Sequence, residues 1–170
     1  SVRVAGDELS DAIGNYLKKV HNLVVGERTA EEIKIRIGSA FPDDAFDQTT
    51  IDVRGLHLLS GLPRTISVRA GDVREAMVEP LNVIVEAVKR TLERTPPELA
   101  ADIVDRGIML AGGGALVRGI SDLISHETGI LTHVAEDPLL CVVNGCGQVL
   151  EDFKRLGRVL DAGDYHRSTT

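Results

Sequence analysis

Apolar residues recur at intervals of three and four over three stretches of the chain, a spacing that places them on one face of a helix. Asp7 precedes the first stretch and is its expected N-cap. Thr29, with Glu32 three residues later, forms a capping-box pattern at the second. Pro80 lies inside the third and predicts a kink. The expected helices run from Asp7 to Val20, from Thr29 to Gly38 and from Asp72 to Leu92.

Shorter stretches alternate apolar and polar positions, which is typical of strands. Gly55, Gly61 and Pro63 suit an irregular hairpin connection between two of them, and the acidic segment from Phe41 to Gln48 is expected to be a loop. A sheet that begins at the first residues of the chain is expected to be truncated at its start. The expected strands are Val2 to Ala5, Thr49 to Val53, Thr65 to Arg69, Gly107 to Leu110 and Leu131 to Val134.

The second half of the chain alternates helices with strands. A short helix is expected from Thr95-Pro96-Pro97-Glu98 through Val104, because proline is tolerated in a first helical turn. Later helices are expected from Leu116 to Glu127 and from Pro138 to about Leu156, followed by a polar tail. Mixed helices and strands predict an α/β fold.

Composition supports this fold class and narrows the possible functions. Apolar residues make up 43% of the 170-residue chain and aromatic residues only 3%, so the core must consist largely of aliphatic side chains. The net charge of -7 argues against nucleic-acid binding, which depends on clustered Lys and Arg. Cys141 and Cys146 are expected to be reduced packing residues, and neither they nor the five histidines have metal-ligand spacing. Without an apolar run of membrane-spanning length, a cytosolic location is expected.

A glycine-rich turn, Gly112-Gly113-Gly114, lies between an expected strand and an expected helix. Glycines allow a ligand to approach the backbone closely and leave N–H groups free, so the turn, with Ala115, could seat a nucleoside. The alternative is a tight turn that needs glycine only for its dihedral angles. No Gly-Lys-Ser/Thr follows, so the turn is not a Walker loop, and nothing in the chain could position a γ-phosphate.

Glu31 and Lys34 form a second candidate site on the second helix. They are three residues apart on the side away from Ile33 and Ile37, so both could reach one external ligand, such as a purine edge or a ribose. A Glu/Lys pair at this spacing can equally serve only to solvate the helix.

Several stretches together resemble the MreB family of bacterial actin-like proteins, which organise cell-wall synthesis in rod-shaped cells. The resemblance covers residues 1 to about 151. It rests on Val4–Glu8, Gly26–Lys34, Ile37–Ala40, Gly61–Arg64, Thr95–Ala100, Arg106–Leu110, Gly112–Leu116 and Val134–Pro138.

The resemblance implies the second half of an actin-like ATPase fold, related to ribonuclease H. It assigns residues 1–7 to the start of lobe IIA, 8–71 to the smaller lobe IIB, and 72–170 to the rest of lobe IIA with its polar tail. The family's contacts with the adenosine of ATP would fall on Glu31, Glu32, Ile33 and Lys34 and on Gly112, Gly113, Gly114 and Ala115. Phosphate loops, the Mg²⁺ site, catalytic residues and a membrane-binding segment would belong to the other half, so this chain alone is not expected to be catalytic.

Two roles follow from the resemblance, and a third from the open edges of the truncated sheet. The parent protein would be a weak, filament-forming ATPase at the inner face of the membrane, working with the cell-wall elongation machinery. The chain could instead act as a docking module for RodZ, a membrane-anchored partner, with no nucleotide activity of its own. A third possibility is that the truncated sheet pairs with a second copy of itself.

Overall fold

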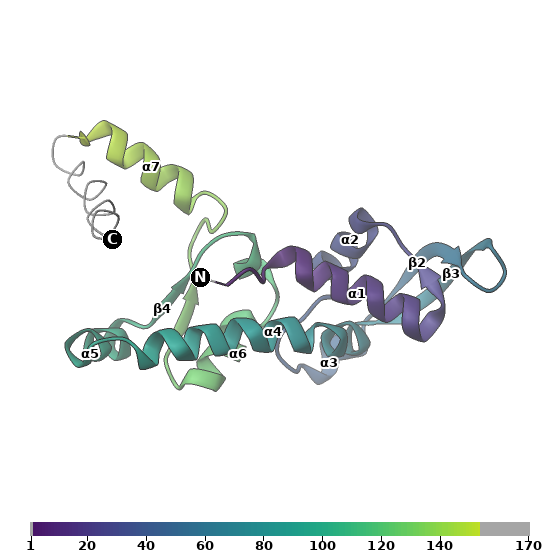
Figure 1. Cartoon of the computed structure of the whole chain (residues 1–170), viewed down its shortest axis with the longest axis horizontal. Coiled ribbons are helices and arrows are strands. Elements are labelled where there is room, and N and C mark those ends of the chain that lie inside the picture. Colours follow the sequence, from purple (N-terminus) through teal and green to yellow (C-terminus); the bar gives the residue numbers. More distant parts are fainter. Residues whose placement is uncertain (1, 154–170) are drawn as a thin grey trace, which may run out of the picture.

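The structure is a computed structural model that describes residues 2–153 and contains two small sheets and seven α-helices within that range. Figure 1 shows an elongated molecule with a sheet toward each end. The elements are α1 (Gly6–His21), β1 (Leu23–Val24), α2 (Glu27–Ile37), α3 (Asp44–Asp47), β2 (Thr50–His57), β3 (Leu62–Arg69), α4 (Ala70–Glu93), α5 (Pro97–Arg106), β4 (Ile108–Leu110), the 3-10 turn η1 (Gly113–Leu116), α6 (Ile120–Thr128), β5 (Thr132–Val134) and α7 (Cys141–Glu151).

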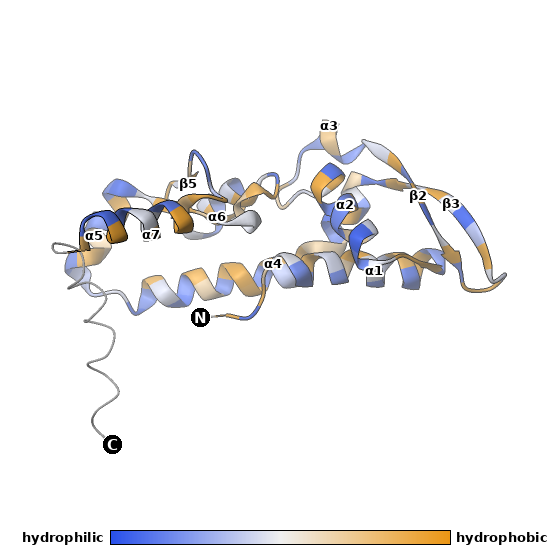
Figure 2. Cartoon of the chain, turned by 90° about the horizontal axis from the view of Figure 1, so that it is seen from above, coloured by the Kyte–Doolittle hydropathy of each residue, from blue (hydrophilic) through white to orange (hydrophobic). Residues whose placement is uncertain are grey.

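The expected amphipathic helices are confirmed, and their apolar faces build the main core. Leu9, Ile13 and Leu17 of α1 are buried beside Met77 and Leu81 of α4. The 24-residue helix α4 continues through Pro80 instead of ending there. Figure 2 shows α4 along one long side of the molecule with α1 beside its first half. This helix therefore connects the two ends of the fold.

Both expected N-caps are wrong. The first helix begins one residue before Asp7, and the carboxylate of Glu8 accepts the Ala5 backbone N–H at 2.8 Å. At α2 the N-cap is Gly26, whose carbonyl accepts the Thr29 N–H at 3.0 Å, so Thr29 already lies inside the helix. In each case the helix starts before the predicted capping residue. The backbone carbonyls of Ala5 and Gly26 already accept the first hydrogen bonds of the two helices.

The hairpin β2–β3 is confirmed and is longer than the alternation predicted. Its eight residue pairs extend from Thr50–Arg69 to His57–Leu62, so Gly55 and Pro63 lie in the strands and not in the connection. Pro63 is tolerated because β3 is an edge strand in the order β1-β2-β3. At Gly55 a Cβ would come 2.5 Å from the Val24 carbonyl oxygen, so glycine permits the close approach of β1.

The expected strand from Val2 to Ala5 is absent, whereas a short strand, β1, forms where none was expected. A strand needs a hydrogen-bonded neighbour. Leu23 and Val24 find one in His57 and Leu56 of β2. Ala5 instead directs its N–H to a side chain of α1. Residues 1–7 were expected to begin lobe IIA, and Ser1 of this segment lies outside the described residues.

The expected loop from Phe41 to Gln48 contains the short helix α3. Asp43 caps it, since its Oδ1 accepts the Phe46 N–H at 3.1 Å. This helix is held by backbone hydrogen bonds within the loop and by tertiary contacts of its side chains. A helix of only four residues is too short to show a periodic apolar pattern in the sequence.

The other sheet is the parallel pair β4–β5, and both strands are confirmed. Helix α5 is also confirmed, within two residues of the expected bounds. Helix α6 begins at Ile120 and not at Leu116, because η1 occupies Gly113–Leu116 and Gly119 adopts a left-handed conformation with φ 73°. A Cβ at Gly119 would lie 2.9 Å from the Cβ of Phe41, so this glycine also permits a close contact.

Helix α7 begins at Cys141, three residues after the expected Pro138, and its expected end near Leu156 and the tail lie outside the described residues. Figure 1 shows it standing away from the rest of the fold. Cys141 is half-buried and Cys146 exposed, both as free thiols, so the prediction that they pack in a core is wrong. No residue of α7 is buried against the other described elements. None of the described helices has the length and apolar character needed to cross a membrane.

Candidate nucleotide site

Helix α2 supplies the first candidate group, and the structure attaches it to α1. Ser10 Oγ donates to Glu31 Oε2 at 2.7 Å, and Lys34 Nζ donates to the same oxygen. Lys34 Nζ also donates to the Gly6 carbonyl oxygen at 2.8 Å. The ammonium of Lys34, and secondly the hydroxyl of Ser10, hold the pKa of Glu31 below its ordinary value. Glu31 is therefore a fixed carboxylate.

The helical spacing predicted that both Glu31 and Lys34 are exposed, and this prediction is wrong for Lys34. The Lys34 side chain is 8% exposed, because it lies between the first turn of α1 and α2, whereas that of Glu31 is 45% exposed. Both hydrogen bonds to Glu31 reach Oε2, so among the described residues Oε1 accepts no hydrogen bond. This oxygen remains available to accept a hydroxyl or amine proton from a ligand.

Glu32 and Ile33 have different surroundings. Glu32 is exposed and lies 3.7 Å from Arg36 in an ion pair along the helix. Ile33 is 1% exposed and belongs to the core, so its side chain faces away from any external ligand. Of the four candidate residues on α2, the two glutamates present carboxylates to solvent.

The glycine turn has the open geometry that its sequence predicted. Gly112 has φ 84° and its N–H donates to the Pro138 carbonyl at 2.7 Å. Gly113 and Gly114 are exposed, and among the described residues their N–H groups donate to no backbone carbonyl. A Cβ at Gly114 would meet nothing within 4 Å, whereas Ala115 is buried at 6% exposure. The turn thus offers two free donors, with open space over Gly114, whereas a Cβ at Gly113 would meet the Leu139 side chain at 3.6 Å.

The segment that follows α2 pairs with the segment that follows the glycine turn, and this links the two candidate groups. Ser39, just after α2, forms a parallel bridge with Arg118, which follows η1. The Ala40 N–H donates to the Arg118 carbonyl oxygen at 2.7 Å. The chain segments that follow Lys34 and Ala115 are therefore directly hydrogen-bonded to each other.

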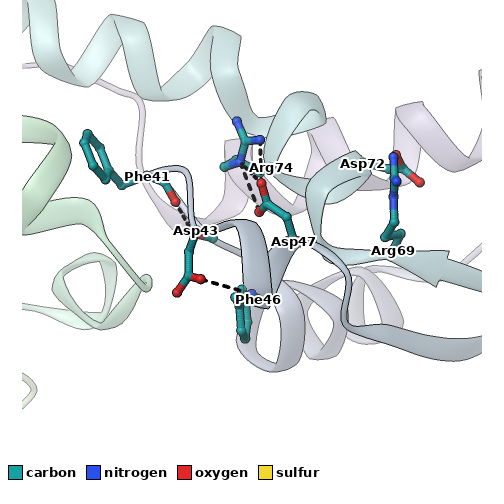
Figure 3. A network of polar contacts seen from close by, with 8 residues as sticks. Phe41, Asp43, Phe46, Asp47, Arg69, Asp72 and Arg74 are labelled. Carbon is teal, nitrogen blue, oxygen red and sulfur yellow. Dashed lines mark hydrogen bonds and ion pairs between the residues drawn. The ribbon is translucent and has the colours of Figure 1, made fainter.

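Polar contacts of the loop around α3 support this connection, and Figure 3 shows the loop from nearby. Arg118 lies 3.0 Å from Asp43 Oδ2, and its guanidinium is 4.2 Å from the centre of the Phe46 ring. The Phe46 N–H, and secondly Arg118, lower the pKa of Asp43. These contacts bind the segment after the glycine turn to the N-terminus of α3.

At the other end of α3, Asp47 forms a two-point ion pair with Arg74 of α4, visible in Figure 3. Arg74 Nη2 lies 2.7 Å from Asp47 Oδ2, and Nε lies 3.2 Å from each carboxylate oxygen. The hydrogen bond to Asp47 raises the pKa of Arg74. A loop that the sequence marked only as polar is thus fixed at both ends.

Arg118 is the residue that sequence reasoning missed. It is a single charged residue four positions after Gly114, and no local pattern distinguishes it from a solvated side chain. Its position became evident only from the bridge to Ser39 and the ion pair to Asp43. Within residues 2–153, no group of three or more His, Cys, Asp or Glu residues is placed to hold a metal ion.

The model of one protein family, described as MreB/Mbl protein, matches residues 1–158. The chain belongs to the MreB/Mbl family. The resemblance inferred from the sequence is therefore confirmed.

Among curated relatives of this MreB/Mbl chain, the cell shape-determining protein Mbl of Bacillus subtilis is 47% identical over 156 residues, which are 92% of this chain and 46% of the relative. The cell shape-determining protein MreB of Escherichia coli is 49% identical over 151 residues, 89% of this chain and 43% of the relative. The chain thus spans about half the length of the curated relatives it matches.

Solved structures confirm the α/β fold. MreB5 of Spiroplasma citri bound to ADP superposes with a TM-score of 0.85 and 32% identity, over 91% of this chain and 46% of that one. The same protein bound to AMPPNP gives a TM-score of 0.84 and 31% identity, over 95% and 47%. A MamK double helical filament gives 0.73 at 18% identity, which supports the actin-like fold alone.

Proposed function

We propose that this chain provides the nucleoside side of an ATP-binding cleft in a filament-forming protein that determines cell shape. The observation that carries the proposal is the match over residues 1–158 to a family whose curated relatives are named cell shape-determining proteins. Structural relatives more than 30% identical hold ADP and AMPPNP. In the proposal the phosphates and Mg²⁺ are bound by chain outside these 170 residues.

The geometry favours a nucleoside at the two candidate groups. Glu31 offers a fixed acceptor in Oε1, which suits a ribose hydroxyl or an exocyclic amine. Gly113 and Gly114 offer two N–H donors, and the open space over Gly114 lets a flat base or sugar lie against the backbone. We assign Glu32, Ile33, Lys34, Gly112 and Ala115 to the same site as supporting residues, with Lys34 acting through Glu31.

Fluorescent ADP binding to the 170-residue chain tests the nucleotide part. We expect weak binding, with a dissociation constant in the millimolar range that corresponds to about 4 kcal/mol, because the phosphate contacts are absent. Gly114→Leu would place a side chain in the open space over the turn and abolish binding. Gly14→Leu, on α1 in a position where a Cβ also meets nothing within 4 Å, is the matched control and should leave binding unchanged.

Two results would refute the nucleotide proposal: no saturable binding up to high millimolar ADP, or equal binding by wild type and Gly114→Leu. The cell-shape part has a separate test. Depletion of the gene product in its host should turn rod-shaped cells round, and unchanged cell dimensions after depletion would contradict this role.

The remaining parts of the proposal rest on family membership. We propose that residues 8–71 form the smaller lobe IIB, and that residues 1–7 and 72–170 form lobe IIA, within a cytoplasmic filament at the inner face of the membrane. MamK filaments and MreB structures share this fold, which favours self-association. Docking of RodZ and of the elongation machinery on lobe IIA belongs to the same proposal, and pull-down with the RodZ cytoplasmic domain tests it.

A further inference from the structure

A groove follows the line where α1 and α4 pack together, on a surface that the proposed nucleotide site does not use. A hollow of about 490 Å³ lies between α1 and α4, and an adjoining hollow of about 720 Å³ is lined by α4 alone; the two share Ala76, Glu79 and Val83, so they are continuous. We call it the α1–α4 groove. Its floor consists of Ala12, Tyr16 and Val20 from α1 and Ala76, Pro80 and Val83 from α4.

The floor is apolar and accessible. Val20 is 58% exposed and Val83 37% exposed, and Val78, at the side of the larger hollow, is 43% exposed. An apolar strip between two helices that pack on each other provides a place where a third helix could pack in the same manner. Figure 2 shows apolar and hydrophilic stretches alternating along α4, with α1 beside it.

Carboxylates surround this floor. Glu75, Glu79 and Glu86 lie along α4, and Glu8 and Asp11 on α1, against Lys19 and Arg90 at the ends. Among the described residues, Glu75 and Glu79 form no ion pair. Burial, and then the negative charges of Asp72 and Glu75, raise the pKa of Tyr16 at the floor. The groove therefore has an apolar base and a negative rim.

We propose that the α1–α4 groove docks a helical segment of a partner protein that carries an apolar stripe flanked by Lys and Arg. From Glu75 to Glu86 the acidic rim extends over eleven residue steps of α4, or about 16 Å at 1.5 Å per step. That length matches three turns of a docked helix, with apolar residues every three or four positions facing the floor. The negative rim disfavours nucleic acid and anionic lipid as occupants.

A synthetic 18-residue helical peptide, with Leu at positions three and four apart and Lys on both sides of the stripe, is a suitable probe. Its binding to the 170-residue chain is measured by fluorescence anisotropy. We expect saturable binding that weakens as salt is raised, and at least tenfold weaker binding of the same peptide with Glu in place of every Lys.

Variants of the chain separate the groove from general charge attraction. Glu79→Lys should weaken binding of the Lys peptide at least tenfold, and Val83→Ser at least threefold. Asp52→Lys, on the exposed face of β2, changes the net charge of the chain by the same amount as Glu79→Lys and should change binding less than twofold. Thermal unfolding followed by circular dichroism verifies that each variant is folded.

Equal weakening by Glu79→Lys and Asp52→Lys would overturn the proposal, because binding would then depend on net charge alone. Absence of saturable binding to the wild-type chain would also overturn it. A second copy of the chain is the other candidate occupant, and sedimentation of the chain without peptide tests it. If the wild-type chain forms a dimer that Glu79→Lys dissociates, a second copy covers the groove, and the proposal of a basic partner helix is overturned.

Discussion

Replacing Lys34 with Met removes the buried link between α1 and α2 while keeping a side chain of similar length. Lys34 is 8% exposed, and its Nζ donates to the Gly6 carbonyl oxygen at 2.8 Å and to the carboxylate of Glu31. After the substitution both acceptors lose this donor, and Glu31 keeps only the hydroxyl of Ser10. We therefore expect a destabilised chain that retains its fold.

The magnitude follows from the two lost hydrogen bonds. A hydrogen bond from a charged donor, such as that from Lys34 to the Gly6 carbonyl, contributes about 1.5–3 kcal/mol. The ion pair to Glu31 adds less than about 1 kcal/mol, because that carboxylate is 45% exposed and water solvates it. The easier burial of Met offsets part of both. We expect a net loss of about 1–2 kcal/mol in the free energy of unfolding, or a Tm lower by about 2–8 °C for a chain of this size.

The loss should depend on pH in a defined direction. The Lys34 ammonium, and secondly the Ser10 hydroxyl, lower the pKa of Glu31 in the folded state. A lowered folded pKa contributes stability above the unfolded value of about 4.3, and this contribution is lost as pH falls through the folded pKa. Lys34→Met removes the largest cause, so the difference from wild type should be greatest near pH 7 and smaller below pH 4.

Urea unfolding followed by circular dichroism at both pH values measures these differences. Lys18→Met is the matched control, because Lys18 is an exposed lysine on α1 and its replacement should change stability by less than about 0.5 kcal/mol. If Lys34→Met were no more destabilising than Lys18→Met, the buried link would not stabilise the fold. If its effect were the same at pH 7 and below pH 4, the coupling between Lys34 and Glu31 would be refuted.

Three further substitutions test the surroundings of the candidate site. Arg118→Ala removes the ion pair at α3 and the contact with an aromatic ring, and should lower the free energy of unfolding by about 1 kcal/mol in urea titrations; no change would show that the link is not stabilising. Gly112→Ala places a Cβ at φ 84° and should cost about 1–2 kcal/mol in thermal unfolding, whereas Gly114→Ala, without positive φ, should cost clearly less; equal losses would contradict the strain argument. Asp47→Asn weakens the two-point pair with Arg74 and should lower the Tm by several degrees in calorimetry, with an unchanged Tm as the contrary result.

Local patterns in the sequence were sufficient for the larger elements. The apolar spacing of α1 and α4 predicted both helices and most of the residues that they bury, because a helical face repeats within a few residues. Val20, which the spacing also placed on the buried face of α1, is 58% exposed. Strand, glycine turn and helix were likewise predicted in the correct order around Gly113, and the turn proved open. Combined with the resemblance carried by short motifs, these patterns were enough to identify the family.

Contacts between distant residues decided the rest. The two-residue strand β1 exists because β2 lies beside it, and the expected strand at Val2–Ala5 has no such ladder in the described structure. Lys34 looks exposed from its helical spacing and is buried because the first turn of α1 packs over it. Arg118 acquires its role only when Ser39 pairs with it. Helical and strand periodicity describes one element at a time, whereas burial and hydrogen-bond partners depend on which elements meet, and only the tertiary structure determines that.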